Sequence, residues 1–294
     1  MEPELLDCIS LRVPADALEA FEAALSSVCR AVSFYHDEEV DEWDIQAVKE
    51  RGEHEEDLAA ALAIAGILTG LSPALSRELV PVAGWLARTQ AAFPEQFIGT
   101  RFAIRGTHIH EPEIPGRITL TLDAGLAFGT GEHNSTRGCL VMLEHYARRH
   151  APRRILDLGT GSGILAIAAA KFLHQPVLAS DIDPRAARVA NANAQLNGVA
   201  ARVHAIQADG WQTPKLTRGA PYHLVFANIL ARPLCAMAHS LAAHLAPNGH
   251  AILAGLLNTQ VNWVLSAHRR QGLVLEHRLI DGAWSILLLR KPGG

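Results

Sequence analysis

The chain has 294 residues, of which 49% are hydrophobic and 19% are charged, and its formal net charge at pH 7 is -4. These values are typical of a folded protein with one large or two ordinary domains, and they exclude the disordered class. The small negative charge provides no field that would attract a nucleic-acid backbone or an anionic membrane, and we predict binding to neither.

The cysteines and the N-terminus indicate the compartment. Cys8, Cys29, Cys139 and Cys235 form no CxxC pair, so neither a disulfide framework nor a zinc site is predicted. The first residues lack the basic and then apolar order of a signal peptide. The apolar run over 58–71 is shorter than the roughly 20 residues of a membrane span. We expect a cytoplasmic monomer without a metal site.

The first hundred residues alternate strand-like and helix-like segments. β-branched and apolar runs predict strands at 5–13, 31–35, 43–48, 78–82 and 97–104, and apolar residues at helical spacing predict helices after Pro14 and over 54–68. This order resembles the β-α-β-β-α-β arrangement of a ferredoxin-like unit. Eleven acidic residues between Asp37 and Asp57 would attract a basic protein or form a solvated face, and both interpretations stay open.

Glycines and prolines over 105–122 predict a linker, which leaves a small α+β domain at 1–104 and a second domain at 123–294. In this second domain, short apolar strands alternate with helical stretches, which predicts an α/β domain with a parallel sheet. The strands are expected at 154–157, 177–181, 203–207, 224–227 and 251–256. Two final strands at 273–279 and 284–289, joined through Asp281 and Gly282, predict an antiparallel hairpin.

The most informative segment, 155–165, reads ILDLGTGSGIL: an apolar strand, three glycines and a helix start. Glycines allow a nucleotide to approach the backbone, and the helix start presents free N–H groups. The spacing GxGxG differs from the GxGxxG dinucleotide fingerprint, and Asp157 stands where a carboxylate could face the ammonium of a methionine moiety. We therefore expect Gly159 and Gly161 to bind S-adenosylmethionine.

Three acids follow later strands of the predicted sheet. Asp181 ends a strand 22 residues after Gly159, where such folds place a carboxylate on the ribose hydroxyls. Asp183 could compete for this role, but it precedes Pro184 and a helix, so it could instead be an N-cap. Asp209 could accept a hydrogen bond from the adenine amino group or could be a turn residue before Gly210.

Two further segments carry polar or apolar groups suited to a cofactor. The segment 126–136 reads LAFGTGEHNST, in which Phe128 offers an apolar face and Thr136 a hydroxyl from a helix start. Such a loop could cover the cofactor, while His133 could touch a ligand or simply begin the helix. The segment ANIL at 227–230 places Asn228 at the carboxyl end of a parallel strand, the edge at which ligands bind in open sheets.

These three segments together resemble the ribosomal protein L11 methyltransferase family. The family's hallmarks are an AFGTG loop followed by H-x-x-T, a D-x-G-x-GSGILAIAA strand and helix, and an ANIL strand end, and all three occur here in this order. The loop departs from the family's common Thr-His-Pro-Thr-Thr run at 132–136. The resemblance implies a class I, Rossmann-like methyltransferase domain with a seven-stranded sheet, preceded by a ferredoxin-like domain that presents the ribosomal protein.

The resemblance also implies an activity. It implies an S-adenosylmethionine-dependent protein methyltransferase that acts on lysine ε-amino or N-terminal α-amino groups of ribosomal protein L11. Thr136, Gly159, Asp181 and Asn228 carry over as cofactor contacts, with Phe128 and Gly161 as additions, and Asn228 is the candidate catalytic residue. The alternatives are a lysine methyltransferase with another protein target, a non-catalytic cofactor-binding module and a nicotinamide oxidoreductase.

Overall fold

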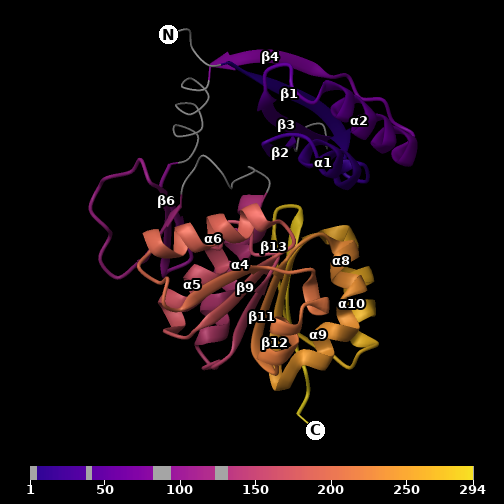
Figure 1. Cartoon of the computed structure of the whole chain (residues 1–294). Coiled ribbons are helices and arrows are strands. Elements are labelled where there is room, and N and C mark those ends of the chain that lie inside the picture. Colours follow the sequence, from indigo (N-terminus) through magenta and orange to yellow (C-terminus); the bar gives the residue numbers. More distant parts are fainter. Residues whose placement is uncertain (1–4, 38–41, 82–93, 123–131, 294) are drawn as a thin grey trace. The chain divides into compact units, whose positions relative to one another are not determined.

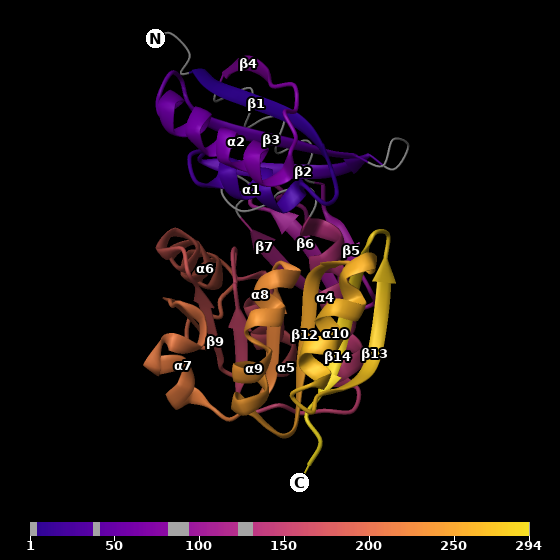
Figure 2. The same ribbon diagram turned by 90° about the vertical axis from the view of Figure 1, so that its right-hand side faces the viewer.

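The computed structural model describes residues 5–37, 42–81, 94–122 and 132–293. Contacts divide the chain into an N-terminal unit within Met1–Phe93 and a larger C-terminal unit that comprises Pro94–Ala127 and Asn134–Gly294. Within the described ranges, no helix combines the length and the apolar character needed to cross a membrane. The two units are shown as ribbons in Figures 1 and 2.

The N-terminal unit has the predicted β-α-β-β-α-β order. Its sheet is antiparallel throughout, in the order β2-β3-β1-β4, and α1 packs against α2 and against the first three strands. Apolar residues of β1 such as Ile9 and Leu11 are buried together with Phe21 of α1 and Ile45 of β3. The elements are β1 (Leu5–Pro14), α1 (Leu18–Ser26), β2 (Ala31–Asp37), β3 (Glu42–Glu50), α2 (Glu55–Thr69) and β4 (Ser76–Pro81).

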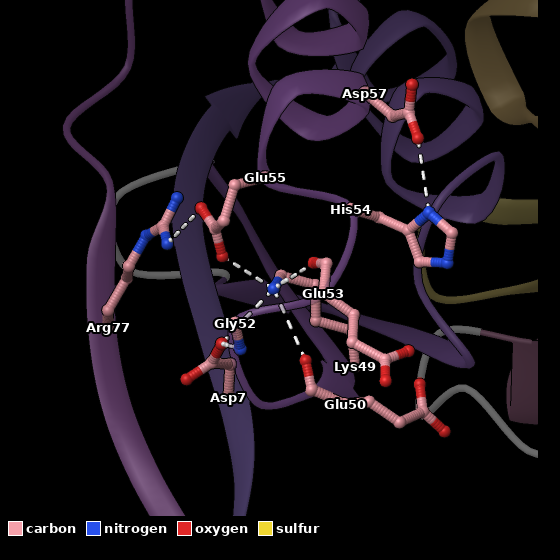
Figure 3. A network of polar contacts seen from close by, with 9 residues as sticks. All are labelled: Asp7, Lys49, Glu50, Gly52, Glu53, His54, Glu55, Asp57 and Arg77. Carbon is pink, nitrogen blue, oxygen red and sulfur yellow. Dashed lines mark hydrogen bonds and ion pairs between the residues drawn. The ribbon is translucent and has the colours of Figure 1, made fainter.

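A buried lysine connects four elements of this unit (Figure 3). The side chain of Lys49 on β3 is 1% exposed, and its Nζ lies 3.1 Å from Asp7 Oδ2 on β1 and 2.6 Å from Glu55 Oε1 at the start of α2. Nζ also donates to the Glu53 carbonyl at 2.6 Å, and Arg77 of β4 pairs with Glu55. A buried charge is tolerated only when it is paired and hydrogen-bonded, and here it is. Glu55, one of the acidic residues between Asp37 and Asp57, therefore makes contacts within the unit.

The C-terminal unit contains a seven-stranded sheet in the order β10-β9-β8-β11-β12-β14-β13. Neighbouring strands from β10 to β12 are parallel, and β14 is antiparallel to both β12 and β13. This confirms the parallel sheet closed by a hairpin. The strands are β8 (Ile155–Leu158), β9 (Val177–Asp181), β10 (Val203–Gln207), β11 (Tyr222–Asn228), β12 (Leu245–Leu257), β13 (Val274–Asp281) and β14 (Trp284–Arg290).

Helices cover both faces of this sheet. One core joins the strands to apolar residues of the helices after β10, among them Leu216, Leu234, Leu241 and Val264. These helices are α7 (Pro214–Gly219), α8 (Ala231–Ala236), α9 (Ala238–His244) and α10 (Val261–Arg269), and Figure 2 shows α8, α9 and α10 together in front of the sheet. The earlier helices are α4 (Glu132–Ala147), α5 (Ile164–Leu173) and α6 (Pro184–Leu196). Strand order reverses between β8 and β11, and open α/β sheets bind ligands at the carboxyl ends of the strands at such a switch point.

The region predicted as a final strand and a linker has a different structure. The strand expected at 97–104 is two strands, β5 (Gln96–Ile98) and β6 (Phe102–Gly106), which form an antiparallel hairpin. The expected linker at 105–122 contains β7 (Ile118–Leu122), which pairs with β6 in a three-stranded sheet. The contact boundary between the units lies at Phe93 and Pro94, so this sheet belongs to the C-terminal unit.

Side chains of three helices hold this small sheet. The buried carboxylate of Glu144 on α4 accepts hydrogen bonds from Thr100 and Arg101 in the β5–β6 turn. Lys171 of α5 donates to the Thr119 carbonyl, and the Asn197 carboxamide after α6 bonds both backbone groups of Thr121. These tertiary contacts turn a glycine- and proline-rich stretch into part of the larger unit.

Candidate active site at the carboxyl edge of the parallel sheet

The predicted site residues of four parallel strands meet at one edge of the sheet. Leu158 of β8 is level with Ser180 of β9 and Ala227 of β11, so that the residues that follow them lie side by side. Gln207 of β10 is level with Asp181. The structure therefore brings Gly159, Asp181, Asp209 and Asn228 to a common edge, where ligands bind in open α/β sheets.

The glycine loop after β8 is fixed by its neighbours. The N–H groups of Gly159 and Thr160 donate to the Ser180 carbonyl at 2.8 and 2.9 Å. Gly159 has a φ of 68°, and a Cβ there would come within 2.3 Å of Cγ2 of Ile229, so the position requires glycine on two grounds. At Gly161, with a φ of 53°, a Cβ would meet nothing within 4 Å. The loop thus presents bare backbone beside open space.

Asp181 and Asp183 have different roles. Asp181 Oδ2 accepts a hydrogen bond from the Gly161 N–H at 2.9 Å, and its Oδ1 accepts one from the Asp183 N–H at 3.1 Å. A partly buried carboxylate is thereby held against the glycine loop. Asp183 Oδ1 accepts from the Arg185 N–H at 2.7 Å and caps α6, which begins at Pro184. The N-cap interpretation of Asp183 is confirmed.

Asp157 supports the glycine loop through one of its carboxylate oxygens. Its side chain belongs to a residue that is 1% exposed, and Oδ2 accepts hydrogen bonds from Thr160 Oγ1 at 2.6 Å and from the Ala166 N–H at 3.2 Å. Burial raises the pKa of Asp157 to about 7, and the two hydrogen bonds oppose that rise. Oδ2 of this carboxylate organises the glycine loop and the start of α5 from within, and the contact of Asp157 with the ammonium of a methionine moiety stays a prediction.

A second part of the edge joins Thr136 of α4 to Asn228 at the end of β11. Thr136 is 4% exposed, and its Oγ1 accepts a hydrogen bond from Asn228 Nδ2 at 3.2 Å. Within the described part of the chain, no hydrogen bond occupies Asn228 Oδ1. Because Nδ2 donates to Thr136, a residue of α4 fixes the orientation of the carboxamide.

The other predicted residues are less constrained. Asp209 is exposed at the start of a short 3₁₀ turn, and its side chain does not cap that turn. Phe128 lies outside the described residues. Glu132 and His133 form the beginning of α4, as one of the two interpretations of His133 expected.

Ile229 was not singled out from the sequence as a site residue, although it belongs to the ANIL motif. Its side chain is the group that excludes a Cβ at Gly159, and a Cβ at Gly255 would lie 2.5 Å from its carbonyl. In the sequence, the only local signal that Ile229 packs against the glycine loop is its bulk directly after the asparagine that ends β11.

Comparison with known proteins gives consistent results. The family model for ribosomal protein L11 methyltransferase (PrmA) matches residues 11–292. A ribosomal protein L11 methyltransferase of Mesorhizobium japonicum is 43% identical over 259 residues, which cover 88% of this chain and 84% of that protein. One from Bradyrhizobium diazoefficiens is 50% identical over 194 residues, or 66% of this chain and 65% of the relative's length.

A solved structure has a similar fold. The crystal structure of a ribosomal protein L11 methylase from Lactobacillus delbrueckii subsp. bulgaricus superimposes with a TM-score of 0.60 at 29% sequence identity. The superposition covers 67% of this chain and 98% of that one. The similarity therefore extends over the whole of the solved chain.

Proposed function

Because the chain belongs to the ribosomal protein L11 methyltransferase family, we propose that it transfers methyl groups from S-adenosylmethionine to lysine ε-amino or N-terminal α-amino groups of ribosomal protein L11. The observation that carries the proposal is the pairing of Asn228 with Thr136 beside the glycine loop, at the carboxyl edge of the sheet. A non-catalytic module is not favoured, since the glycine loop and the asparagine motif are both intact.

The residues at this edge fit S-adenosylmethionine. The open space beside Gly161 allows a ligand to approach the backbone, and Asp181 offers a carboxylate for the ribose hydroxyls. Gly159, Thr136 and Phe128 would form the rest of the cradle, with Asp209 near the adenine. When bound, S-adenosylmethionine supplies a methyl group activated by its sulfonium charge.

The acceptor amine must be neutral, because its nitrogen lone pair forms the new bond to carbon. A lysine with a pKa near 10.4 costs about 4 to 5 kcal/mol to neutralise at pH 7. Asn228 Oδ1 would accept a hydrogen bond from the amine and direct the lone pair toward the methyl carbon. We propose that Asn228 accelerates transfer mainly by orientation, so that no dedicated general base is required.

We further propose that the N-terminal unit, predicted at 1–104 and ending at Phe93 by its contacts, recognises the ribosomal protein. Its acidic surface supports this role: Glu53, Glu56 and Asp57 are exposed around the start of α2, in addition to the acids that pair internally. Such a surface attracts a basic partner. We further propose a cytoplasmic monomer: the scattered cysteines fit a reducing compartment, and the net charge of -4 provides no field that would attract nucleic acid or an anionic membrane.

The test is transfer of labelled methyl groups from S-adenosylmethionine to purified, unmethylated ribosomal protein L11. We expect Asn228→Ala to lower kcat by about a hundredfold or more while it still binds S-adenosylmethionine, and Asp181→Asn to weaken that binding. Asp183→Ser, which keeps an N-cap, is the matched control and should retain activity.

Two outcomes would contradict the proposal. If ribosomal protein L11 is not labelled although S-adenosylmethionine protects the chain against thermal unfolding, the proposed substrate is wrong. The chain would then be a methyltransferase that acts on another protein. If NAD protects the chain against thermal unfolding and S-adenosylmethionine does not, the proposed methyl transfer is wrong.

A further inference from the structure

A group of metal-ligating side chains lies at the opposite end of the same sheet. His250 of β12 is level with Leu224 of β11, which is level with Ile155, the first residue of β8. The glycine loop follows the other end of β8. His250 is therefore at the amino edge of the parallel strands, away from the residues proposed to bind S-adenosylmethionine.

Three potential ligand atoms converge at this edge. His150, after the end of α4, His250 on β12 and Glu276 on β13 each offer one ligand atom, and the three atoms lie within 4.8 Å of one another. His250 Nε2 is 3.0 Å from Glu276 Oε2, and the rings of His150 and His250 lie 4.4 Å apart. These residues come from separate elements that the fold brings together.

Two features of the fold point the side chains at each other. Leu275 pairs with Leu289 and His277 with Leu288, so that Glu276 is the extra residue of a β-bulge. Bulges re-aim side chains and occur next to functional sites. Arg290 holds the other carboxylate oxygen, with its Nε 2.5 Å from Glu276 Oε1, which leaves Oε2 toward His250. Such outer partners orient ligands in metal sites.

The spacing suits a tetrahedral ion. With metal bonds of about 2.0 to 2.2 Å, neighbouring ligand atoms of a tetrahedral zinc site are about 3.3 Å apart. The observed 3.0 Å between His250 and Glu276 is close to this value, and His150 needs to move by about an ångström and a half at most. A cavity of about 410 Å³, lined by His150 and Glu276 and also by His145 and His277, gives access from solvent.

We propose that His150, His250 and Glu276 bind a divalent transition-metal ion of the Zn²⁺ class, with water at the fourth position. Imidazole and carboxylate together are ligands that zinc accepts. The positive charge of the nearby Arg290 guanidinium weakens the binding of any cation at this site. Hard ions are disfavoured most, because they gain little from imidazole ligands.

The consequence of occupancy is structural. An ion at this position would link the residue after α4 to β12 and to the edge strand β13. Binding to the folded state alone would raise the melting temperature in proportion to the logarithm of ion concentration. The site lies away from the glycine loop, so this stabilisation should not require S-adenosylmethionine.

The test uses the full-length protein, freed of metal with a chelator and titrated with Co²⁺ followed by absorption and with Zn²⁺ followed by calorimetry. We expect saturable binding of one ion per chain and a raised Tm. His150→Gln and Glu276→Gln should each weaken binding by at least about tenfold. His150 is only partly buried, so that variant should fold, whereas His250 is buried and is a less suitable target.

The matched control is His239→Gln, an exposed histidine on α9. It should bind as the parent chain does. Equal affinity in His150→Gln and the parent would overturn the proposal, as would loss of binding in His145→Gln or His277→Gln alone. Absence of saturable binding in the parent chain would also overturn it.

Discussion

Asp157 shows how a single buried carboxylate links the glycine loop to stability. Its pKa of about 7, raised by burial, exceeds that of an aspartate in the unfolded chain. Between about pH 4 and pH 7 the folded chain therefore holds a proton that the unfolded chain has released. The contribution of this residue to stability must fall as pH rises through that window, and the loss is complete above pH 7.

Asp157→Asn removes this pH dependence. An asparagine oxygen can still accept from Thr160 and Ala166, but it carries no charge to bury. Relative to the parent chain, the variant should gain stability between pH 4.5 and pH 8, by on the order of a few kcal/mol. Urea unfolding at the two pH values measures the difference, with Asp16→Asn, an exposed acid, as control. A difference that is the same at both pH values would contradict the assignment.

Several residue roles followed from sequence because they depend on local chemistry. The N-cap at Asp183 is set by the proline and helix that follow it, and Gly159 by the turn it must form. The role of Asp157 did not follow, since pattern alone does not show which way a side chain points. Trp263 has helical spacing with the buried Val261 and Leu265 but is itself 47% exposed on α10. Spacing identifies a helix face approximately, and a neighbouring position can fall outside the buried stripe.

At the scale of elements, the parallel strands were predicted well because a buried strand between helices has a continuous apolar run. β9 and β10 begin and end at the predicted residues. The region 97–122 was not predicted well. Gly99, with a φ of 53°, turns the chain between β5 and β6, and periodicity does not distinguish this hairpin from one longer strand. β7 depends on Lys171 and Asn197, which lie far away in the sequence.

Glu144 is the element-scale contact that we expect to matter most for the β5–β6–β7 sheet. Its two oxygens accept three hydrogen bonds, from the Thr100 N–H, Thr100 Oγ1 and the Arg101 N–H. Glu144→Gln replaces one acceptor oxygen by a donor and leaves a part-buried donor of the β5–β6 turn without its acceptor. This should cost about 1 to 3 kcal/mol.

Hydrogen exchange resolved by peptide gives the measurement. In Glu144→Gln, exchange should accelerate in peptides that cover 95–122, while peptides of the N-terminal unit should be unchanged. Glu56→Gln, an exposed acid on α2, is the control and should leave both regions as they are. Unchanged protection of 95–122 in the Glu144 variant would show that the sheet does not depend on this contact.

At the scale of the whole molecule, the order of elements in the N-terminal unit and in the seven-stranded sheet followed from sequence. The identity of the methyl acceptor did not follow from the residues alone. Composition and strand order indicate a methyltransferase-type sheet, but no local sequence pattern identifies a protein substrate. That part of the prediction came from motif resemblance, which the family match over residues 11–292 confirms at the level of the family. The region that recognises the acceptor must therefore be sought among the exposed surfaces of the chain. One candidate surface lies on α2.

The α2 helix leaves a group of large apolar side chains exposed. Ile64, Ile67 and Leu68 are 59%, 83% and 74% exposed in the C-terminal half of the helix, whose first turn is acidic. An apolar patch beside charge is typical of a protein-binding surface. If the N-terminal domain recognises ribosomal protein L11, Ile67→Glu should lower kcat/KM for that protein by about tenfold, through KM.

The same variant should leave binding of S-adenosylmethionine unchanged, because no cofactor residue lies on α2. Leu196→Glu, which alters a 49% exposed residue at the end of α6, is the matched control and should preserve kcat/KM. Titration of ribosomal protein L11 under steady-state conditions, with S-adenosylmethionine saturating, separates the two variants. If Ile67→Glu methylates this protein with the parental KM, then α2 does not contact the acceptor, and recognition must involve another surface of the chain.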